Sequence, residues 1–151
     1  MISRRHHDHS RYSRGQSSVE LALSVPLLML LLLVAVEAGR ICMISLSLGS
    51  AARAGVQYGG QSLITVNDTA GMQSAATADA PNLPSMIAIG GHFCKCADGT
   101  ASTCLATDCA ASHRVVYVKT DTSATYTPLL TWPGMPIAMT LTGKAIMRVS
   151  Q

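Results

Sequence analysis

Residues 14–40 read RGQSSVELALSVPLLMLLLLVAVEAGR, and this stretch decides the architecture of the chain. Within it, the run from Leu21 to Val36 carries no charged side chain. As an α-helix the run rises about 24 Å, close to the hydrocarbon thickness of a bilayer. We therefore expect a transmembrane helix. Glu20 stands at its start, where a carboxylate is costly unless another group neutralises it, so Glu20 is the first candidate functional residue.

The positive charge of the chain is concentrated at its N-terminus. Four of the 11 Lys and Arg residues and one of the 8 Asp and Glu residues lie within residues 1–15, so the rest of the chain is neutral. A neutral body argues against a nucleic-acid partner, which needs a basic surface. Because basic flanks of an apolar helix stay on the cytoplasmic side, we expect a cytoplasmic N-terminus and place residues after about 45 outside the cytoplasm.

Three interpretations of this N-terminus compete. A cleaved secretory signal would combine basic, apolar and small residues, but the apolar run is longer than usual, and Glu37 and Arg40 crowd the cleavage point. An uncleaved membrane anchor is the second interpretation. The third depends on the spacing of Gly15 and Glu20, five residues apart.

Residues 14–28 resemble the class III signal of type IV pilin-like proteins, which a prepilin peptidase cleaves after a glycine on the cytoplasmic face. The resemblance implies cleavage after Gly15, with Gln16 as the new N-terminal residue and Glu20 as the fifth mature residue. Pro26 corresponds to the proline in the first helical turns of that family. Proline removes one backbone hydrogen bond, so we expect the helix to bend or loosen there.

Within that superfamily the chain resembles TadE, a pseudopilin of the tight-adherence (Tad, or Flp) pilus machinery. Four segments carry the resemblance: VELALSVPLL at 19–28, VEAGR at 36–40, AARAGVQYG at 51–59 and PGMPIAMTLTGKAIMRVSQ at 133–151. It implies a single-pass protein of the inner membrane with a periplasmic C-terminal domain, which becomes extracellular if it enters a pilus. The implied partners are the membrane, prepilin peptidase, other pilin and pseudopilin subunits, and the Tad inner-membrane platform proteins.

The resemblance also implies that Glu20 pairs with the N-terminal ammonium of a neighbouring subunit. An unpaired carboxylate in an apolar bundle carries a penalty of several kcal/mol or becomes protonated. A partner ammonium relieves that penalty only in one axial register, so the charge would specify subunit geometry. The alternative is that Glu20 marks the helix start, at the positive end of the helix dipole.

We expect three parts: a basic leader at 1–15, a transmembrane pilin-like helix at 16–58 and a small extracytoplasmic α+β domain at 59–151. Glu37 and Arg40 can form an ion pair on one helical face at the outer membrane edge. A stripe of small residues would allow a second helix to approach closely. It consists of Gly39, Ser45, Gly49, Ala52 and Gly55.

Four cysteines lie close together in the exported domain. Such a cluster predicts disulfides in an oxidising compartment. Cysteines two positions apart on a strand do not easily reach disulfide geometry, so Cys94 is not expected to pair with Cys96. A nested and a crossed pairing both remain open. The four are Cys94, Cys96, Cys104 and Cys109.

A zinc site is the alternative use of these cysteines, because His92 and His113 bracket them. Their spacing is not the usual paired C-x2-C of zinc sites, so we expect disulfides and no metal. The fifth cysteine, Cys42, is expected in the long helix as a packed thiol.

The exported domain shows one helical and three extended segments. Residues 67–80 predict a short helix, capped by Asp68 or Thr69 and stopped by the prolines of 81–84. Residues 86–89 predict a short strand before Gly90 and Gly91.

Residues 114–126 are rich in Val, Thr and Tyr, which predicts a half-buried strand. Residues 137–142 alternate, and after a kink at Gly143 a second alternating set follows. We therefore expect an antiparallel sheet packed on the outer part of the long helix. The expected inward residues are Val116, Val118, Thr120, Thr122, Ile137, Met139, Leu141, Ala145, Met147 and Val149.

The sequence holds no convincing catalytic constellation. The two glutamates lie in or near the membrane, and the adjacent Ser112 and His113 lack a third group in a defined geometry. We expect no enzyme, no cofactor and no small-molecule substrate. The predicted function is a minor pilin or pseudopilin of the Tad pilus assembly system. The alternative is a membrane-anchored periplasmic binding or adhesion protein that does not enter a filament.

Overall fold

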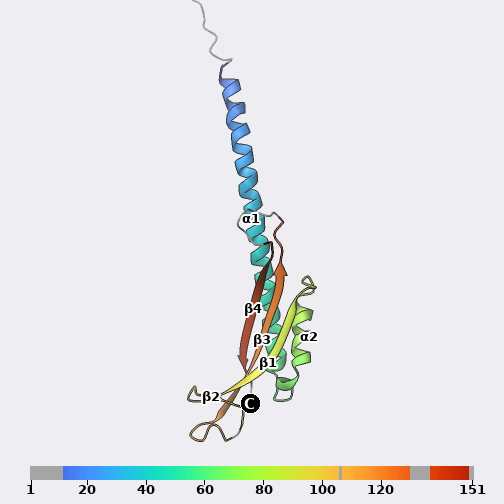
Figure 1. Cartoon of the computed structure of the whole chain (residues 1–151), viewed down its shortest axis with the longest axis vertical. Helices are drawn as coiled ribbons and strands as arrows, with labels where there is room; N and C mark the ends of the chain where they lie inside the picture. The colour runs from blue at the N-terminus through green and yellow to red at the C-terminus, as the bar shows by residue number, and fades with distance from the viewer. Residues whose placement is uncertain (1–11, 106, 130–136, 150–151) are drawn as a thin grey trace, which may run out of the picture. The chain divides into compact units, whose positions relative to one another are not determined.

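The computed structural model describes residues 12–105, 107–129 and 137–149, so most of the expected basic leader lies outside the described residues. The chain divides into two compact units, Met1–Gly39 and Arg40–Gln151. One long helix, α1 (Tyr12–Gly59), begins in the first unit and ends in the second (Figure 1). Its end agrees with the predicted end of the long helix at residue 58.

The first unit contributes the apolar part of α1. The helix continues through Pro26 without interruption. Its apolar side chains are exposed, with Leu23 74% and Leu28 62% exposed. Such a surface is unfavourable in water, whereas lipid or a neighbouring helix would cover it.

The second unit is an α+β domain built on an antiparallel sheet with strand order β2-β1-β3-β4. Each neighbouring pair of strands is antiparallel. The fold class predicted from the sequence is therefore confirmed. Its elements are the 3-10 helix η2 (Thr65–Asn67), α2 (Thr69–Asp79), β1 (Ile87–Cys96), β2 (Ala101–Ser102), β3 (Arg114–Tyr126) and β4 (Met139–Arg148).

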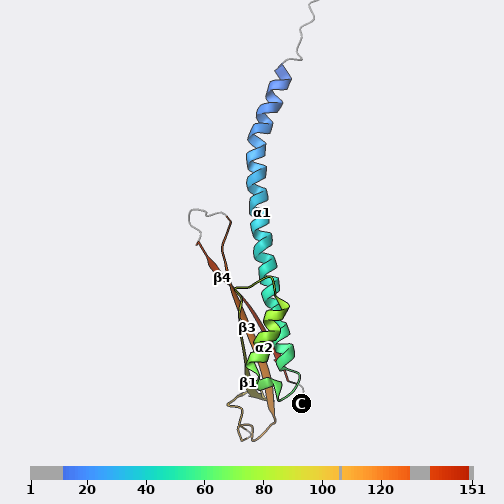
Figure 2. The same ribbon diagram turned by 90° about the vertical axis from the view of Figure 1, so that its right-hand side faces the viewer.

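Helix α2 and the second part of α1 lie beside the sheet (Figure 2). Two hydrophobic clusters join the inner face of the sheet to these helices. In one cluster Leu48 packs with Ala124, and in the other Met72 packs with Val118. The Thr122 hydroxyl donates a hydrogen bond of 2.9 Å to the buried Leu48 carbonyl. The sheet thus packs on the outer part of the long helix, as the sequence predicted.

Gly143 is a contact point between β4 and α1, and β4 pairs with β3 without a break on either side of it. A Cβ atom added at Gly143 would lie 2.6 Å from the carbonyl carbon and oxygen of Leu48. The strand thus continues through Gly143, the position of the expected kink, and the glycine lets the strand approach the helix backbone.

Two other expectations about the strands need correction. The first strand does not stop before Gly90 but continues to Cys96, because Gly90 makes room for Met72 of α2: an added Cβ would lie 2.8 Å from the Met72 Cβ. Ile137 lies outside β4 and is 78% exposed, so it is not an inward residue. The strand predicted at 114–126 is confirmed over its full length as β3.

The small-residue stripe expected on α1 is partly used inside the chain. Ala52 is fully buried, and an added Cβ at Gly55 would lie 2.7 Å from the Thr120 hydroxyl oxygen. Cys42 is exposed, so the expected packed thiol is wrong for this chain by itself. The reason is helical phase. Ile44 packs on the core, and residues two apart in an α-helix point to nearly opposite sides.

Candidate functional site

The candidate processing and assembly residues lie along the first turns of α1. The helix backbone includes Gly15 and Gln16, and Gln16 stands one turn before Glu20. Glu20 is exposed, and its carbonyl accepts a hydrogen bond of 2.7 Å from the Ser24 hydroxyl. The Glu20 side chain thus extends from the apolar part of α1 and is not buried within the described part of this chain.

The apolar part of α1 is long and apolar enough to cross a membrane. The candidate span is Ser17–Gly59, with a mean hydropathy of 2.6 over its best window and none of that window buried in the chain. An exposed apolar helix of this length is typical of a single membrane anchor. Within its sequence only Glu20, Glu37, Arg40 and Arg53 are charged.

Arg40, where the second unit begins, stacks on the sheet domain. Its guanidinium carbon lies 5.3 Å from the centre of the Tyr126 ring, and Tyr126 is only 2% exposed. A cation over an aromatic face is an attractive contact. This contact was not predicted from the sequence, and the expected ion pair of Arg40 with Glu37 stays a prediction.

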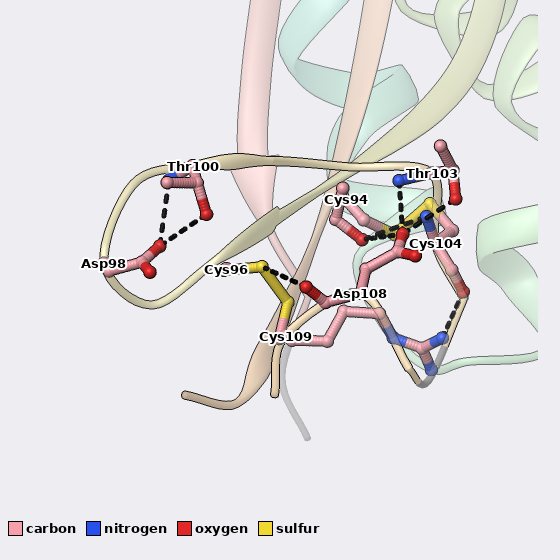
Figure 3. The surroundings of a disulfide bond; sticks show 10 residues. Cys94, Cys96, Asp98, Thr100, Thr103, Cys104, Asp108 and Cys109 are labelled. Atoms are coloured by element: carbon pink, nitrogen blue, oxygen red, sulfur yellow. Dashed lines mark hydrogen bonds between the residues drawn. A yellow bond between two sulfur atoms is a disulfide. The ribbon is translucent and has the colours of Figure 1, made fainter. Parts of the chain in front are cut away.

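The disulfide loop is the second candidate site, and Figure 3 shows its residues. Cys94 is joined to Cys104 and Cys96 to Cys109, so the pairing is the crossed one. Because each of these sulfurs forms a disulfide, none remains as a thiolate ligand for the alternative zinc site. The two bonds tie the end of β1 to the segment that leads into β3.

Asp108 connects two parts of this loop through hydrogen bonds to its carboxylate. One of its carboxylate oxygens accepts hydrogen bonds from the Ser102 hydroxyl at 3.0 Å, the Thr103 N–H at 2.6 Å and the Thr103 hydroxyl at 2.7 Å. Such donors favour the ionised form of a carboxyl group. The Thr103 hydroxyl, followed by the Ser102 hydroxyl, holds the pKa of Asp108 below its ordinary value. The role of Asp108 was not predicted from the sequence, because hydrogen bonds between a carboxylate and hydroxyl groups across a loop do not follow a fixed spacing of residues.

The backbone of Cys104 shows how tightly the loop is fixed. Its φ is 72°, in a region that residues with a Cβ atom seldom adopt. The Ser102 hydroxyl accepts a hydrogen bond of 3.0 Å from the Cys104 N–H, and the Arg114 guanidinium donates to the Cys104 carbonyl. Together with the disulfide to Cys94, these contacts hold a conformation that the residue would not choose alone.

We expect the loop to loosen in acid. The pKa of Asp108 is depressed below its ordinary value of 3.8. The stability contributed by its charge is therefore present above that value and is lost as pH falls through the lower folded-state pKa. Asp108→Asn should mimic that loss at neutral pH and speed hydrogen exchange of the Thr103 amide several-fold.

Asp79→Asn, at an exposed position of α2, is the matched control and should leave the exchange of the Thr103 amide unchanged. If the Thr103 amide of Asp108→Asn exchanged as slowly as that of the unchanged protein, the role given to Asp108 in this loop would be contradicted.

A third contact fastens the end of α1 to the start of α2. The Tyr58 hydroxyl donates a hydrogen bond of 2.6 Å to Asp68, whose other carboxylate oxygen accepts from the Gly71 N–H at 2.8 Å. The hydrogen bond from Tyr58, then that from Gly71, holds the pKa of Asp68 below its ordinary range. Asp68 is the helix N-cap, so of the two cap candidates, Asp68 and Thr69, the structure selects the first. Its bond to Tyr58 was not predicted.

These features define a class of protein: one candidate membrane-spanning helix that leads into a small, disulfide-linked α+β domain. Residues 15–57 match the family model of TadE-like proteins, so this segment is similar to that family. The match contains Glu20 and Pro26 and ends just before the last turn of α1 is complete. It does not extend to the resemblance expected at 133–151. No curated protein and no solved structure matches the chain.

The similarity of residues 15–57 to TadE-like proteins suggests a link to the Tad pilus system, and the apolar helix is a candidate membrane span. The matched segment ends before the disulfide loop. The two candidate sites therefore have different support: the helix rests on the family and on its hydropathy, and the loop rests on its own geometry.

Proposed function

We propose that this chain is a minor pilin or pseudopilin of the Tad pilus assembly system. In this proposal the protein is held in the inner membrane by α1, with a cytoplasmic N-terminus and a periplasmic sheet domain, and has a structural role rather than an enzymatic one. Prepilin peptidase cleaves it after Gly15. Other pilin subunits and the Tad platform proteins are its partners.

The observation that carries the proposal is a single carboxylate at the start of an exposed apolar helix. Glu20 is the first of only two acidic residues in the TadE-like segment, and the exposed apolar run follows it directly. When such helices pack together, the carboxylate loses water and needs a cation. The ammonium created by cleavage before Gln16 supplies one from a neighbouring subunit.

The expected result of Glu20→Gln is a loss of assembled pili at an unchanged level of protein in the membrane. The amide keeps the size of the side chain but removes the charge that selects the neighbour's ammonium. We expect at least a tenfold drop, since one lost charge pair of about 1.4 kcal/mol corresponds to that factor. Pili sheared from cells and quantified against membrane-bound protein provide the measurement.

Ser24→Ala, one turn further along the same helix, is the control and should assemble normally. Normal pili from Glu20→Gln would favour the alternative function, a membrane-anchored binding or adhesion protein outside the filament. The crossed disulfides support that alternative, because they give the domain a rigid exposed loop suited to contact with a partner.

A further inference from the structure

The sheet has an open edge at β4. In the strand order β2-β1-β3-β4 this strand lies at the end, and β3 is its only strand partner within the described residues, paired from Tyr126 opposite Met139 to Tyr117 opposite Arg148. At the opposite side of the sheet, the short strand β2 pairs with Cys94 and Lys95 at the end of β1. A long uncovered edge is a template for pairing with another extended chain.

The direction of the free backbone groups follows from one bond. The Val149 N–H donates to the Val116 carbonyl at 2.9 Å, so Val149 faces β3. In an antiparallel strand successive residues face opposite sides, so the odd-numbered residues of β4 face β3 and the even-numbered residues face the open edge. The residues that present N–H and C=O groups at the edge are Thr140, Thr142, Lys144, Ile146 and Arg148.

The side chains of the same residues lie on the outer face of the sheet, where they are exposed. Ile146, 51% exposed, lies between the two cations Lys144 and Arg148. Lys144 stands opposite Asp121 in the register, and the Asp121 carboxylate lies 4.0 Å from the Lys119 ammonium. β4 thus carries two cations and no acidic residue, while β3 carries Arg114, Lys119 and the single acidic residue Asp121, so the edge region has a net positive charge.

A second copy of this chain fits the edge poorly. In the symmetric antiparallel registers that pair nearly the whole strand, Lys144 of one copy lies directly opposite or diagonally next to Lys144 of the other. Like charges at such positions are destabilising. The charge pattern therefore favours a different partner with negative charges in the matching positions.

We propose that the β4 edge binds an extended segment of a different protein, which adds a strand to the sheet. The segment carries acidic side chains at alternate positions opposite Lys144 and Arg148 and an apolar side chain between them, opposite Ile146. Backbone hydrogen bonds supply affinity in this mode of recognition, and the alternate side chains supply specificity. The proposal does not depend on entry of the chain into a pilus.

The test uses the full-length protein in its own cells with a photo-crosslinking amino acid at Thr142. Ser123 on β3 is the matched control position, because it stands directly opposite Thr142 in the sheet and is one strand further from the edge. We expect Thr142 to crosslink preferentially to a second protein, within a segment of alternating acidic residues. Lys144→Glu with Arg148→Glu should lower that yield about fivefold, as expected for two cross-strand charge pairs.

Four outcomes would overturn the proposal: equal yields from the two positions, a crosslink between two copies of this chain, a yield insensitive to the charge reversal, or no crosslink at Thr142. Circular dichroism and the amount of protein in the membrane show whether the doubly reversed variant folds. Should it fold poorly, Lys144→Gln takes its place, with a smaller loss of yield expected.

Discussion

Gly143→Val is expected to destabilise the sheet domain by about 3 kcal/mol, the cost of forcing a large side chain into a tightly packed interior. The Cβ alone would lie 2.6 Å from the Leu48 carbonyl group and 2.7 Å from the Thr122 hydroxyl oxygen. Leu48 is fully buried and its backbone is part of α1, so the helix cannot yield without breaking the bond from Thr122. We therefore expect β4 and α1 to move apart where they pack against each other.

Hydrogen exchange of the β3 and β4 amides, in the full chain in detergent micelles, measures this loss as a free energy of opening. Thr142→Val is the matched control, because it places the same side chain one residue away on the exposed face. It should change the free energy by no more than about 0.5 kcal/mol. Equal effects from the two variants would show that Gly143 does not contact the helix as described.

Removal of the Cys94–Cys104 disulfide is the second change with a large expected effect. The double variant Cys94→Ala with Cys104→Ala opens a loop with a sequence separation of 10. The added freedom of the unfolded chain should lower stability by about 3 kcal/mol. Cys94 is also buried in the cluster that contains Val116 and Val118, so the loss of packing adds to the effect.

The measurement is the midpoint of thermal unfolding, together with the count of reactive thiols in the native protein. Cys42→Ser is the control and should not move the midpoint, because Cys42 is a free, exposed thiol. Stability unchanged after removal of this disulfide would mean that the Cys96–Cys109 disulfide and the hydrogen bonds to Asp108 hold the loop without it.

Several elements could be predicted from the sequence because local chemistry decides them. The alternation of Val and Thr marks both ends of β3, and Asp68 followed by the prolines of 81–84 marks both ends of α2. The end of α1 was predicted to within one residue. In these cases propensity, capping and burial favour the same structure.

Other features depend on contacts between distant segments. Gly90 and Gly143 look like strand breaks in the sequence, but each lies where a strand passes close to a helix. The crossed disulfide pairing follows from the path of residues 97–105 and 107–113, which the order of four cysteines in the sequence does not determine. The stack of Arg40 on Tyr126 joins residues far apart in the chain.

The candidate site was predicted in the same uneven way. Glu20 is recognisable from the apolar run that follows it, because a lone charge beside such a run is unusual. Asp108 is one aspartate among several in loops, and its role depends on two hydroxyl side chains that fold onto it. The open edge of β4 becomes visible only when the strand order is known.

The N-terminal residue of the membrane-extracted protein tests the central claim most directly. The proposed pairing requires a free ammonium on Gln16 of the neighbouring subunit, and this ammonium exists only after cleavage between Gly15 and Gln16. Intact-mass and N-terminal peptide mass spectrometry should find a chain that begins at Gln16. A chain that still begins at Met1 would contradict the account, because no such ammonium would be available to Glu20.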